Sequence, residues 1–377
     1  MTTIHGTCDE RFAAVRDAFA ANFDRGEDDG ACVAVTIGGE PVVDLWAGVA
    51  DVTSGRPWER DTIVNVYSTT KTMSFVCILM LADRGLVEIN APVATYWPEF
   101  AANGKDRIEV RHLLSHSAGL SGWDQVLTTE DLYDWEKATS LLAAQAPWWE
   151  PGTASGYHAV TQGYLLGEVV RRVDGRTIGQ FFADEVAGPL GADFHIGLPA
   201  SEDDRVAALV PPELSTAGLA AAGDIAQRTF ASAPMTGEEP ATTGWRRAEI
   251  PAAGGIGNAR AVARIHSALA CGGSVDGVRL MEPKTVDRIF ETQIEGDDLV
   301  LGVPIRFGLG FGLPSAAMPI SPSERACFWG GWGGSIAVID VDQQMTVAYA
   351  MNRMAAGLVG DLRGGSLVLA AYQALQA

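Results

Sequence analysis

Lysine is scarce in this chain: four of its 27 basic residues are lysines, and the other 23 are arginines. The basic residues are outnumbered by 47 acidic residues, which leaves a formal net charge of −20 over 377 residues. Nucleic-acid binding requires clustered Lys and Arg side chains, so this balance excludes a nucleic-acid partner. The same negative charge argues against docking onto an anionic membrane surface.

Cysteine and long apolar runs are also sparse. The five cysteines form no C-x-x-C pair, and an odd number without such spacing predicts a reducing compartment rather than a disulfide framework. No apolar run approaches the roughly 20 residues that a membrane span requires. Residues 1–11 lack the basic and apolar regions of a signal peptide. We therefore expect a cytoplasmic protein that does not cross a membrane.

Both ends of the chain predict the same kind of structure. Apolar stretches joined by short turns predict strands over residues 31–37, 41–46, 335–340 and 345–350. Apolar residues at helical spacing predict one helix near each end, over residues 10–24 and 367–375. Strands at both ends of a helix-rich chain predict one antiparallel sheet built from both termini.

The middle of the chain predicts an inserted helical region. Its clearest helical patterns cover residues 108–116 and 162–173. Residues 201–244 lack clean periodicity and are expected to form a long irregular connection. The length suggests two or three domains. We expect an α/β domain formed by residues 1–70 and 245–377, and a helical domain formed by residues 71–244.

One of the four lysines follows a serine in Ser68-Thr69-Thr70-Lys71, just before the apolar run 75–81. If a helix begins near Ser68, the hydroxyl and the amine lie on one face, and the hydroxyl lies at the positive end of the helix dipole. Burial of so apolar a helix favours a neutral amine, which arginine cannot supply. Ser68 and Lys71 are therefore a candidate nucleophile and base. The spacing alone is equally compatible with a serine N-cap followed by a lysine that extends to solvent.

Two glycine-rich segments are further candidates. Residues 151–157 predict a loop that places Tyr157 just before a helix, where functional side chains are common. Residues 328–335 contain Trp329-Gly330-Gly331-Trp332 and lead into a strand, and their glycines permit the close approach that an oxyanion hole requires. Each segment has a structural alternative, because Tyr157 can be a half-buried aromatic residue and the glycines a tight turn with a bulge.

Taken in order, the three segments resemble the S-x-x-K, Y-x-N and K-T-G motifs of the superfamily of serine β-lactamases, penicillin-binding proteins and family VIII carboxylesterases. Further stretches that resemble this superfamily are residues 111–120, 150–153, 253–260 and 307–311. The resemblance covers most of the chain, and the order of the motifs is more specific than any one of them. It implies an α/β plus all-α fold like that of class C β-lactamases, an antiparallel sheet flanked by helices with an inserted helical domain. The active site is then expected in the groove between the two domains.

The chain departs from the β-lactamase motifs at two places. Tyr157-His158-Ala159 lacks the amide of Y-x-N, and Trp329-Gly330-Gly331 lacks the lysine that anchors a β-lactam carboxylate in K-T-G. Both departures weaken the case for hydrolysis of penicillins or cephalosporins. The tryptophan resembles the family VIII carboxylesterases, which tend to have W-G-G or H-G-G there. The resemblance thus implies a serine esterase that acts on a small ester with a short acyl chain.

The residue roles follow from this resemblance together with the chemistry of the side chains. Ser68 is expected to form a covalent ester after neutral Lys71 takes its proton, and Tyr157 to deliver a proton to the leaving alcohol. The backbone amides of Ser68 and Trp332 are expected to bind the oxyanion. Residues expected to contact the substrate are Trp329, Gly330, Gly331 and His158. Trp329 and Trp332 are expected to line an apolar pocket for short acyl or aryl groups, with Trp148 and Trp149 as further candidates. Trp148 and Trp149 are equally compatible with a place in the core.

Alternatives on the same fold are a β-lactamase or D,D-peptidase, and an acyltransferase or amide hydrolase. A non-catalytic binding protein is a third alternative, which the joint presence of the serine, lysine and tyrosine disfavours. His112 and His116 have a spacing that can bind zinc, but Leu113 stands where a metalloprotease has its glutamate. No P-loop is present, and the glycines of residues 308–312 lack the context of a dinucleotide site. We expect neither a metal nor a cofactor, and the sequence leaves the oligomeric state open.

Overall fold

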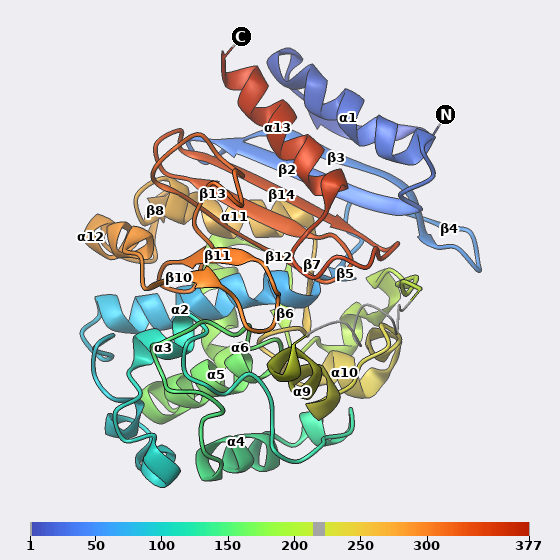
Figure 1. The fold of residues 1–377 in the computed structure, drawn as a ribbon. Helices are drawn as coiled ribbons and strands as arrows, with labels where there is room; N and C mark the ends of the chain where they lie inside the picture. The colour runs from blue at the N-terminus through green and yellow to red at the C-terminus, as the bar shows by residue number, and fades with distance from the viewer. Residues whose placement is uncertain (1, 214–222, 377) are drawn as a thin grey trace.

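The computed structural model describes residues 2–213 and 223–376 (Figure 1). Its main sheet is antiparallel and has the strand order β1-β3-β2-β14-β13-β12, with β4 paired to β3. The strands are β1 (Ile4–Cys8), β2 (Gly30–Ile37), β3 (Glu40–Asp51), β4 (Arg56–Pro57), β12 (Ala326–Gly330), β13 (Ile336–Asp340) and β14 (Met345–Met351). The two ends of the chain meet at β2 and β14, where Ile37 lies opposite Met345. The predicted antiparallel sheet built from both termini is confirmed.

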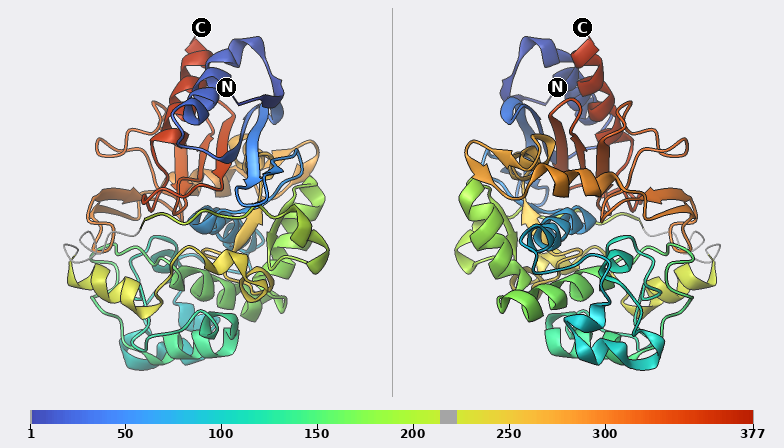
Figure 2. Two further views of the ribbon diagram at one scale, coloured as in Figure 1. Left: turned by 90° about the vertical axis from the view of Figure 1, so that its right-hand side faces the viewer. Right: turned by 90° about the vertical axis from the view of Figure 1, so that its left-hand side faces the viewer.

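Helices cover both faces of this sheet. The terminal helices α1 (Ala13–Asp24) and α13 (Leu362–Gln376) lie side by side on one face, and α11 (Ala259–Ala270) lies on the other (Figures 1 and 2). Helix α13 begins five residues before the predicted start. Its first turn contains two glycines, which are poor helix formers, so the sequence pattern did not reveal this turn as helical. A Cβ on Gly364 would lie 2.8 Å from Ile336 Cγ2, so this glycine lets the helix approach the sheet closely.

The helical region lies below the sheet in Figure 1. Its helices are α2 (Lys71–Asp83), α3 (Val110–Leu114), α4 (Trp135–Ala144), α5 (Thr161–Asp174), α6 (Ile178–Phe182), α7 (Gly188–Leu190), α9 (Asp224–Ser232) and α10 (Thr243–Arg247). Helix α2 is buried without interruption from Lys71 to Leu81, as expected for a helix that is apolar all round. It lies between the sheet and the other helices (Figure 1), so its first turn faces the junction between the two regions.

The helix predicted over residues 108–116 is longer than the helix in the structure. Helix α3 ends at Leu114, and His116 has a φ of +58°, which no α-helix tolerates. The irregular connection predicted over residues 201–244 was wrong in part, because it contains α9 and the start of α10. Helix α9 is short and rich in Ala, Ser and Thr, which weakened its apolar periodicity. Residues 214–222 of that prediction lie outside the described residues.

Small sheets complete the fold. Strand β7 (Gly255–Gly257) pairs with β5 (Val64–Asn65) and with β6 (Phe194–Ile196), which joins the segment before Ser68 to the helical region. Further elements of the described residues are the hairpins β8 (Ser274–Val275) with β9 (Val278–Arg279) and β10 (Ile294–Asp297) with β11 (Pro304–Phe307), helix α12 (Pro283–Asp287) and several short 3-10 turns. The domain boundaries at residues 70 and 245 stay a prediction. No helix of the described residues is long and apolar enough to cross a bilayer.

Candidate active site

Ser68 lies in a tight turn between β5 and α2. Residues 67–70 form a single 3-10 turn that continues directly into α2 at Lys71. Tyr67, at the start of the turn, has a φ of +43°, an unusual value for a large side chain that signals backbone strain. Its buried ring packs against Trp332 and Trp245, with ring centroids 5.0 and 6.2 Å away. Aromatic packing therefore holds the strained residue that precedes the serine.

The serine and the lysine are in direct contact. Lys71 Nζ donates to Ser68 Oγ over 3.0 Å, and it also donates to the carbonyl oxygens of Ala159 (2.7 Å) and Ala252 (3.0 Å). All three acceptors are neutral, and no carboxylate within the described residues forms an ion pair with Lys71. Lys71 is 0% exposed and Ser68 is 7% exposed. Complete burial without a counter-charge lowers the pKa of the Lys71 amine well below its usual value, which favours the neutral base.

Tyr157 lies beside both the lysine and the serine. The Lys71 Nζ is 4.7 Å from the centroid of the Tyr157 ring, and the tyrosine is buried. Burial raises the pKa of Tyr157, although the neighbouring Ser68 hydroxyl and Trp329 indole act in the opposite direction. The Tyr157 Oη makes no hydrogen bond of standard geometry. The tyrosine is therefore a protonated phenol that has a free hydroxyl close to Ser68.

The backbone amides of Ser68 and Trp332 are both free of hydrogen-bond acceptors among the described residues. The Ser68 amide is free because the first N–H groups of a helical turn have no partner within it. The Trp332 segment is fixed beside it, since Ser335 Oγ donates to Val66 O over 2.8 Å and lies 2.9 Å from Thr69 Oγ1. A Cβ on Gly331 would lie 2.2 Å from Val66 O, so only glycine permits this approach. Two free amides on neighbouring segments fit an oxyanion hole.

Trp329 is part of a buried aromatic cluster. Its ring lies 5.3 Å from that of Tyr157, 5.4 Å from that of Phe307 and 5.8 Å from that of His116. The tryptophan is 0% exposed, so it packs against Tyr157 instead of forming an open pocket wall. Its indole Nε1 is buried without a hydrogen-bond partner, which leaves one donor free beside the tyrosine.

Three other expected contact residues, His158, Trp148 and Trp149, are engaged with parts of the protein other than Ser68. His158 is fully buried, and its ring bonds to Gly156 O over 2.6 Å and accepts the Leu120 N–H over 3.1 Å. Burial lowers the pKa of His158 to about 3, so it is a neutral residue that holds the loop and is not open to a substrate. Trp148 stacks with the Arg228 guanidinium, and Trp149 packs against His158. Both tryptophans are half-buried, and neither contacts Ser68 or Lys71 in the described residues.

Comparison with known proteins places this geometry in a family. A family model described as Beta-lactamase matches residues 16–370. The chain belongs to the β-lactamase family. A Mycobacterium tuberculosis protein described as esterase/beta-lactamase LipL is 38% identical to it over 372 residues, which are 94% of this chain and 84% of that protein. The chain is accordingly an enzyme of the β-lactamase-like serine hydrolases.

Two solved structures support this placement over the full length of the chain. A family VIII carboxylesterase is 45% identical, with a TM-score of 0.93 over 99% of this chain and 100% of that chain. A penicillin-binding protein homologue from Caulobacter crescentus is 41% identical, with a TM-score of 0.92 over the same shares. The expected class C β-lactamase-like fold and the family resemblance are both confirmed.

Several residues that build this β-lactamase-family site were not predicted. Ala159 and Ala252 contribute only backbone carbonyls, which leave no signal in a sequence. Asp298 accepts the Tyr157 N–H over 2.9 Å, although Asp297-Asp298 resembles an ordinary exposed acidic turn in the sequence. The two candidate zinc ligands, His112 and His116, each use Nδ1 to accept a backbone N–H, from Glu109 and His158. The described residues contain no group of three or more His, Cys, Asp or Glu that could hold a metal ion.

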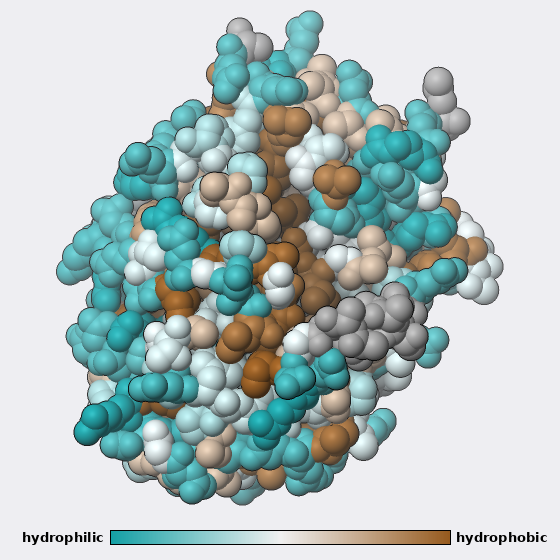
Figure 3. Space-filling view, viewed as in Figure 1, coloured by the Kyte–Doolittle hydropathy of each residue, from teal (hydrophilic) through white to brown (hydrophobic). Residues whose placement is uncertain are grey.

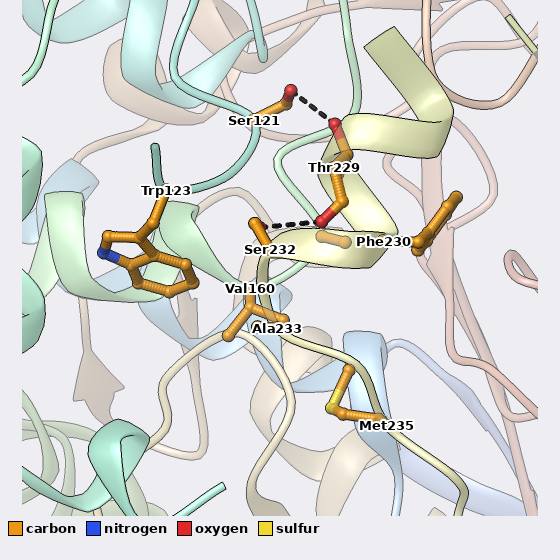
Figure 4. Close-up of a pocket in the computed structure, with 9 residues that line it drawn as sticks. Ser121, Trp123, Val160, Thr229, Phe230, Ser232, Ala233 and Met235 are labelled. Carbon is orange, nitrogen blue, oxygen red and sulfur yellow. Dashed lines mark hydrogen bonds between the residues drawn. The ribbon is translucent and has the colours of Figure 1, made fainter. Parts of the chain in front are cut away.

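A small cavity lies next to the lysine site, between α9 and the 121–123 loop (Figure 4). Ser121 Oγ and Thr229 Oγ1 are hydrogen-bonded across it over 2.7 Å, and Ser232 Oγ donates to Thr229 O over 2.8 Å. Its volume of about 10 Å³ is at the lower limit for a single water molecule. This cavity is therefore too small for a substrate, and the bond between Ser121 and Thr229 holds α9 against the 121–123 loop.

Proposed function

We propose that this protein is a carboxylesterase that hydrolyses small esters through an acyl intermediate on Ser68. The observation that carries the proposal is the pairing of Ser68 with a buried, neutral Lys71 at 3.0 Å, in a site where Trp329 lies beside Tyr157. The expected K-T-G lysine, which would attract a substrate carboxylate, is replaced by this tryptophan. An uncharged ester therefore suits the site better than an anionic β-lactam. The names of the esterase relatives support the same reaction.

Acylation uses the three side chains in turn. Lys71 Nζ accepts the proton of Ser68 Oγ, and the oxygen attacks the ester carbonyl carbon. The carbonyl oxygen becomes an oxyanion that accepts hydrogen bonds from the amides of Ser68 and Trp332. When the intermediate collapses, the carbon–oxygen bond to the alcohol breaks. Tyr157 gives its hydroxyl proton to the departing alkoxide and takes a proton from the Lys71 ammonium.

Deacylation follows the same route with water as the nucleophile. Neutral Lys71, directly or through Tyr157, accepts a proton from water as the water oxygen attacks the acyl carbon. The same two amides hold the second oxyanion. The bond to Ser68 Oγ then breaks, the serine regains its proton, and the carboxylic acid leaves. No step requires a metal or a cofactor, and we propose that the partner is a small uncharged ester in the cytoplasm.

A panel of substrates tests this function on the purified protein. We expect turnover of p-nitrophenyl acetate and butyrate, and loss of that turnover by about 10³-fold or more in Ser68→Ala and in Lys71→Ala. A folded Ser68→Ala or Lys71→Ala that retains near wild-type turnover would contradict the assigned roles. Amide substrates and added alcohol acceptors in the same panel distinguish amide hydrolysis and acyl transfer from ester hydrolysis.

A second candidate function is β-lactam hydrolysis, which is favoured by the name esterase/beta-lactamase of the Mycobacterium tuberculosis relative. Nitrocefin belongs in the same panel. A kcat/KM for nitrocefin above that for every ester would reverse the order of the two candidates. We expect the opposite order, because position 329 carries a buried tryptophan and no cation that would attract a β-lactam carboxylate.

A further inference from the structure

A larger cavity borders the candidate site and is lined only by apolar side chains. It has a volume of about 230 Å³. Leu301, Val303 and Ile305 form one wall, Leu358 and Val359 form a second, and Met318 completes the lining. Figure 3 shows the molecule from the same side as Figure 1. Apolar side chains gather in a hollow near the centre of this view, beside the position of β10 and β11 in Figure 1. Val303 is 44% exposed, which is unusual for a valine whose neighbours are also apolar.

Part of the cavity lining packs against the buried cluster that contains Tyr157 and Trp329. Ile305 belongs to the same buried cluster as Tyr157 and Trp329, and Leu301 and Val359 pack against that cluster. The second wall lies against the Trp329-Gly330-Gly331 segment, since a Cβ on Gly330 would lie 2.7 Å from the Val359 carbonyl carbon. Both walls of the cavity therefore pack against the cluster that supports the candidate catalytic tyrosine.

We infer that this cavity binds the apolar group of the substrate, a short alkyl chain or a single aryl ring. The inference rests on the proposed ester hydrolysis and adds the residues that select the substrate. The lining contains no ionisable side chain, so an uncharged hydrocarbon group is the chemistry it fits. Its volume lies below the 300–1,000 Å³ that is typical of sites for drug-sized ligands, which fits a short group.

The test compares Val303→Trp with Val52→Trp on p-nitrophenyl acetate, butyrate, hexanoate and octanoate. Val52 lies in the turn between β3 and β4 and is 46% exposed, so it matches Val303 in type and exposure. Each methylene that finds a place in the cavity is expected to raise the wild-type kcat/KM roughly fourfold until the cavity is full. Val303→Trp is expected to abolish this gain for the longer chains and to leave the acetate rate within threefold.

A Val303→Trp profile that coincides with the Val52→Trp and wild-type profiles would overturn the inference. It would leave the proposed function intact, because that function is judged on Ser68→Ala and Lys71→Ala. The variant Leu358→Ala tests the opposite change, because a smaller side chain at this position enlarges the cavity. It is expected to shift the optimum towards longer chains, and an unchanged optimum would also count against the cavity.

A second inference stands on hydrogen bonds instead of the cavity. Asp298 is 2% exposed, and its Oδ1 accepts the backbone N–H groups of Tyr157, Val300 and Leu301, each over 2.9 Å. The Leu299 N–H donates to Ser155 O over 2.8 Å, next to these bonds. One carboxylate thus joins the loop that carries Tyr157 to the loop that lines the cavity.

The structure assigns Asp298 the role of a positioning residue for Tyr157. Its Oδ2 is buried without a hydrogen-bond partner, so charge-assisted bonds to three amides are what keep this carboxylate in place. The contact is made to the backbone of the tyrosine itself, and a shift of about 1 Å in a catalytic group can reduce a rate about 10²-fold. Asp298 is expected to affect turnover through Tyr157 without touching the substrate.

The test uses Asp298→Ala, Asp298→Asn and the exposed neighbour Asp297→Ala as a matched control. Asparagine keeps an oxygen that can accept the same three N–H groups, whereas alanine removes it. Asp298→Ala is expected to lower kcat for p-nitrophenyl acetate by 10- to 100-fold at a KM within threefold of wild type. Asp298→Asn is expected to restore kcat to within threefold of wild type.

The following outcomes distinguish a positioning role of Asp298 from a role in stability alone. If Asp298→Ala fails to fold, the kcat of Asp298→Asn decides the question, and a tenfold loss in that variant would contradict a role based on hydrogen-bond acceptance. Wild-type kcat in a folded Asp298→Ala would overturn the inference outright. Asp297→Ala should match wild type in all of these measurements.

Discussion

At the scale of the residue, the environment of a lysine matters more than its rarity. Lys71 and Lys105 are both buried in a chain that uses arginine almost everywhere else, and each donates to backbone carbonyls. Scarcity of lysine therefore does not by itself identify a catalytic amine. Lys71 differs because one of its acceptors is a serine hydroxyl at 3.0 Å.

The protonation state of Lys71 predicts how activity depends on pH. Burial lowers the pKa of this amine, so it is neutral and basic at high pH and is protonated as the pH falls through its lowered pKa. We expect kcat/KM to decrease on the acidic side for this reason. Lys71→Arg carries a permanent charge and should lose about 10²- to 10⁴-fold in kcat/KM at every pH. Lys137→Arg, on the surface, is the control, and a Lys71→Arg variant with a wild-type pH profile would contradict the assignment.

At the scale of the element, patterns with strong alternation or apolar runs were predictable and short helices were not. The strands from residues 31 to 46 and from 335 to 350 were found because half or all of their side chains enter the core. Helix α9 was not predicted from the sequence, because its nine residues include few large apolar side chains and therefore resemble a loop. Helix α3 was overextended because the strained backbone at His116 is set by tertiary packing, which no local pattern reveals.

Lys105 closes the C-terminal end of α4. Its Nζ donates to the carbonyl oxygens of Ala143 and Gln145 at that end and to Ala102 O in the segment before Lys105. Burial lowers the pKa of Lys105 to about 8, below the value of an exposed lysine. The unfolded chain therefore binds more protons than the folded chain above pH 8, so this group makes stability rise between pH 8 and 10.

The variant Lys105→Met isolates that contribution. We expect the free energy of unfolding of wild type to rise relative to Lys105→Met as the pH increases from 8 to 10, and the difference to be level below pH 8. Urea unfolding at pH 7, 8, 9 and 10 measures it, and the contribution of Lys71 cancels because both proteins contain it. A difference that falls over this range would show that Lys105 stays charged in the folded protein.

At the scale of the whole molecule, both ends of the chain are tied to the candidate oxyanion segment. Arg363 of α13 is nearly buried and donates to Asp28, which precedes β2, over 2.9 Å and to Asp361 over 2.6 Å. The same guanidinium donates to Gly333 O, one residue after Trp332. Asp28 in turn accepts the Tyr349 hydroxyl over 2.6 Å.

This scale also marks the limit of what the sequence could predict about the site. Ser68, Lys71 and Tyr157 were accessible because each stands in a motif with its own spacing, and the structure brings the three together. Asp28 and Arg363 are 335 positions apart and carry no motif. Their meeting depends on the pairing of β2 with β14, which follows from the complete fold and not from any local stretch.

The Arg363 network makes a prediction that separates stability from turnover. Arg363→Met leaves the Asp28 and Asp361 carboxylates without their cation, and loss of one partner of a buried pair typically lowers the free energy of unfolding by about 3–5 kcal/mol. It also removes a donor from Gly333 O, so the Trp332 amide is less firmly held and kcat should fall about tenfold at a temperature where the variant is folded. Arg353→Met is the control, because its ion pair with Asp29 is partly exposed and is expected to contribute less than about 1 kcal/mol. Urea unfolding and esterase assays on both variants measure the two effects, and an Arg363→Met enzyme with wild-type kcat would show that the ends of the chain stabilise the fold without fixing the oxyanion segment.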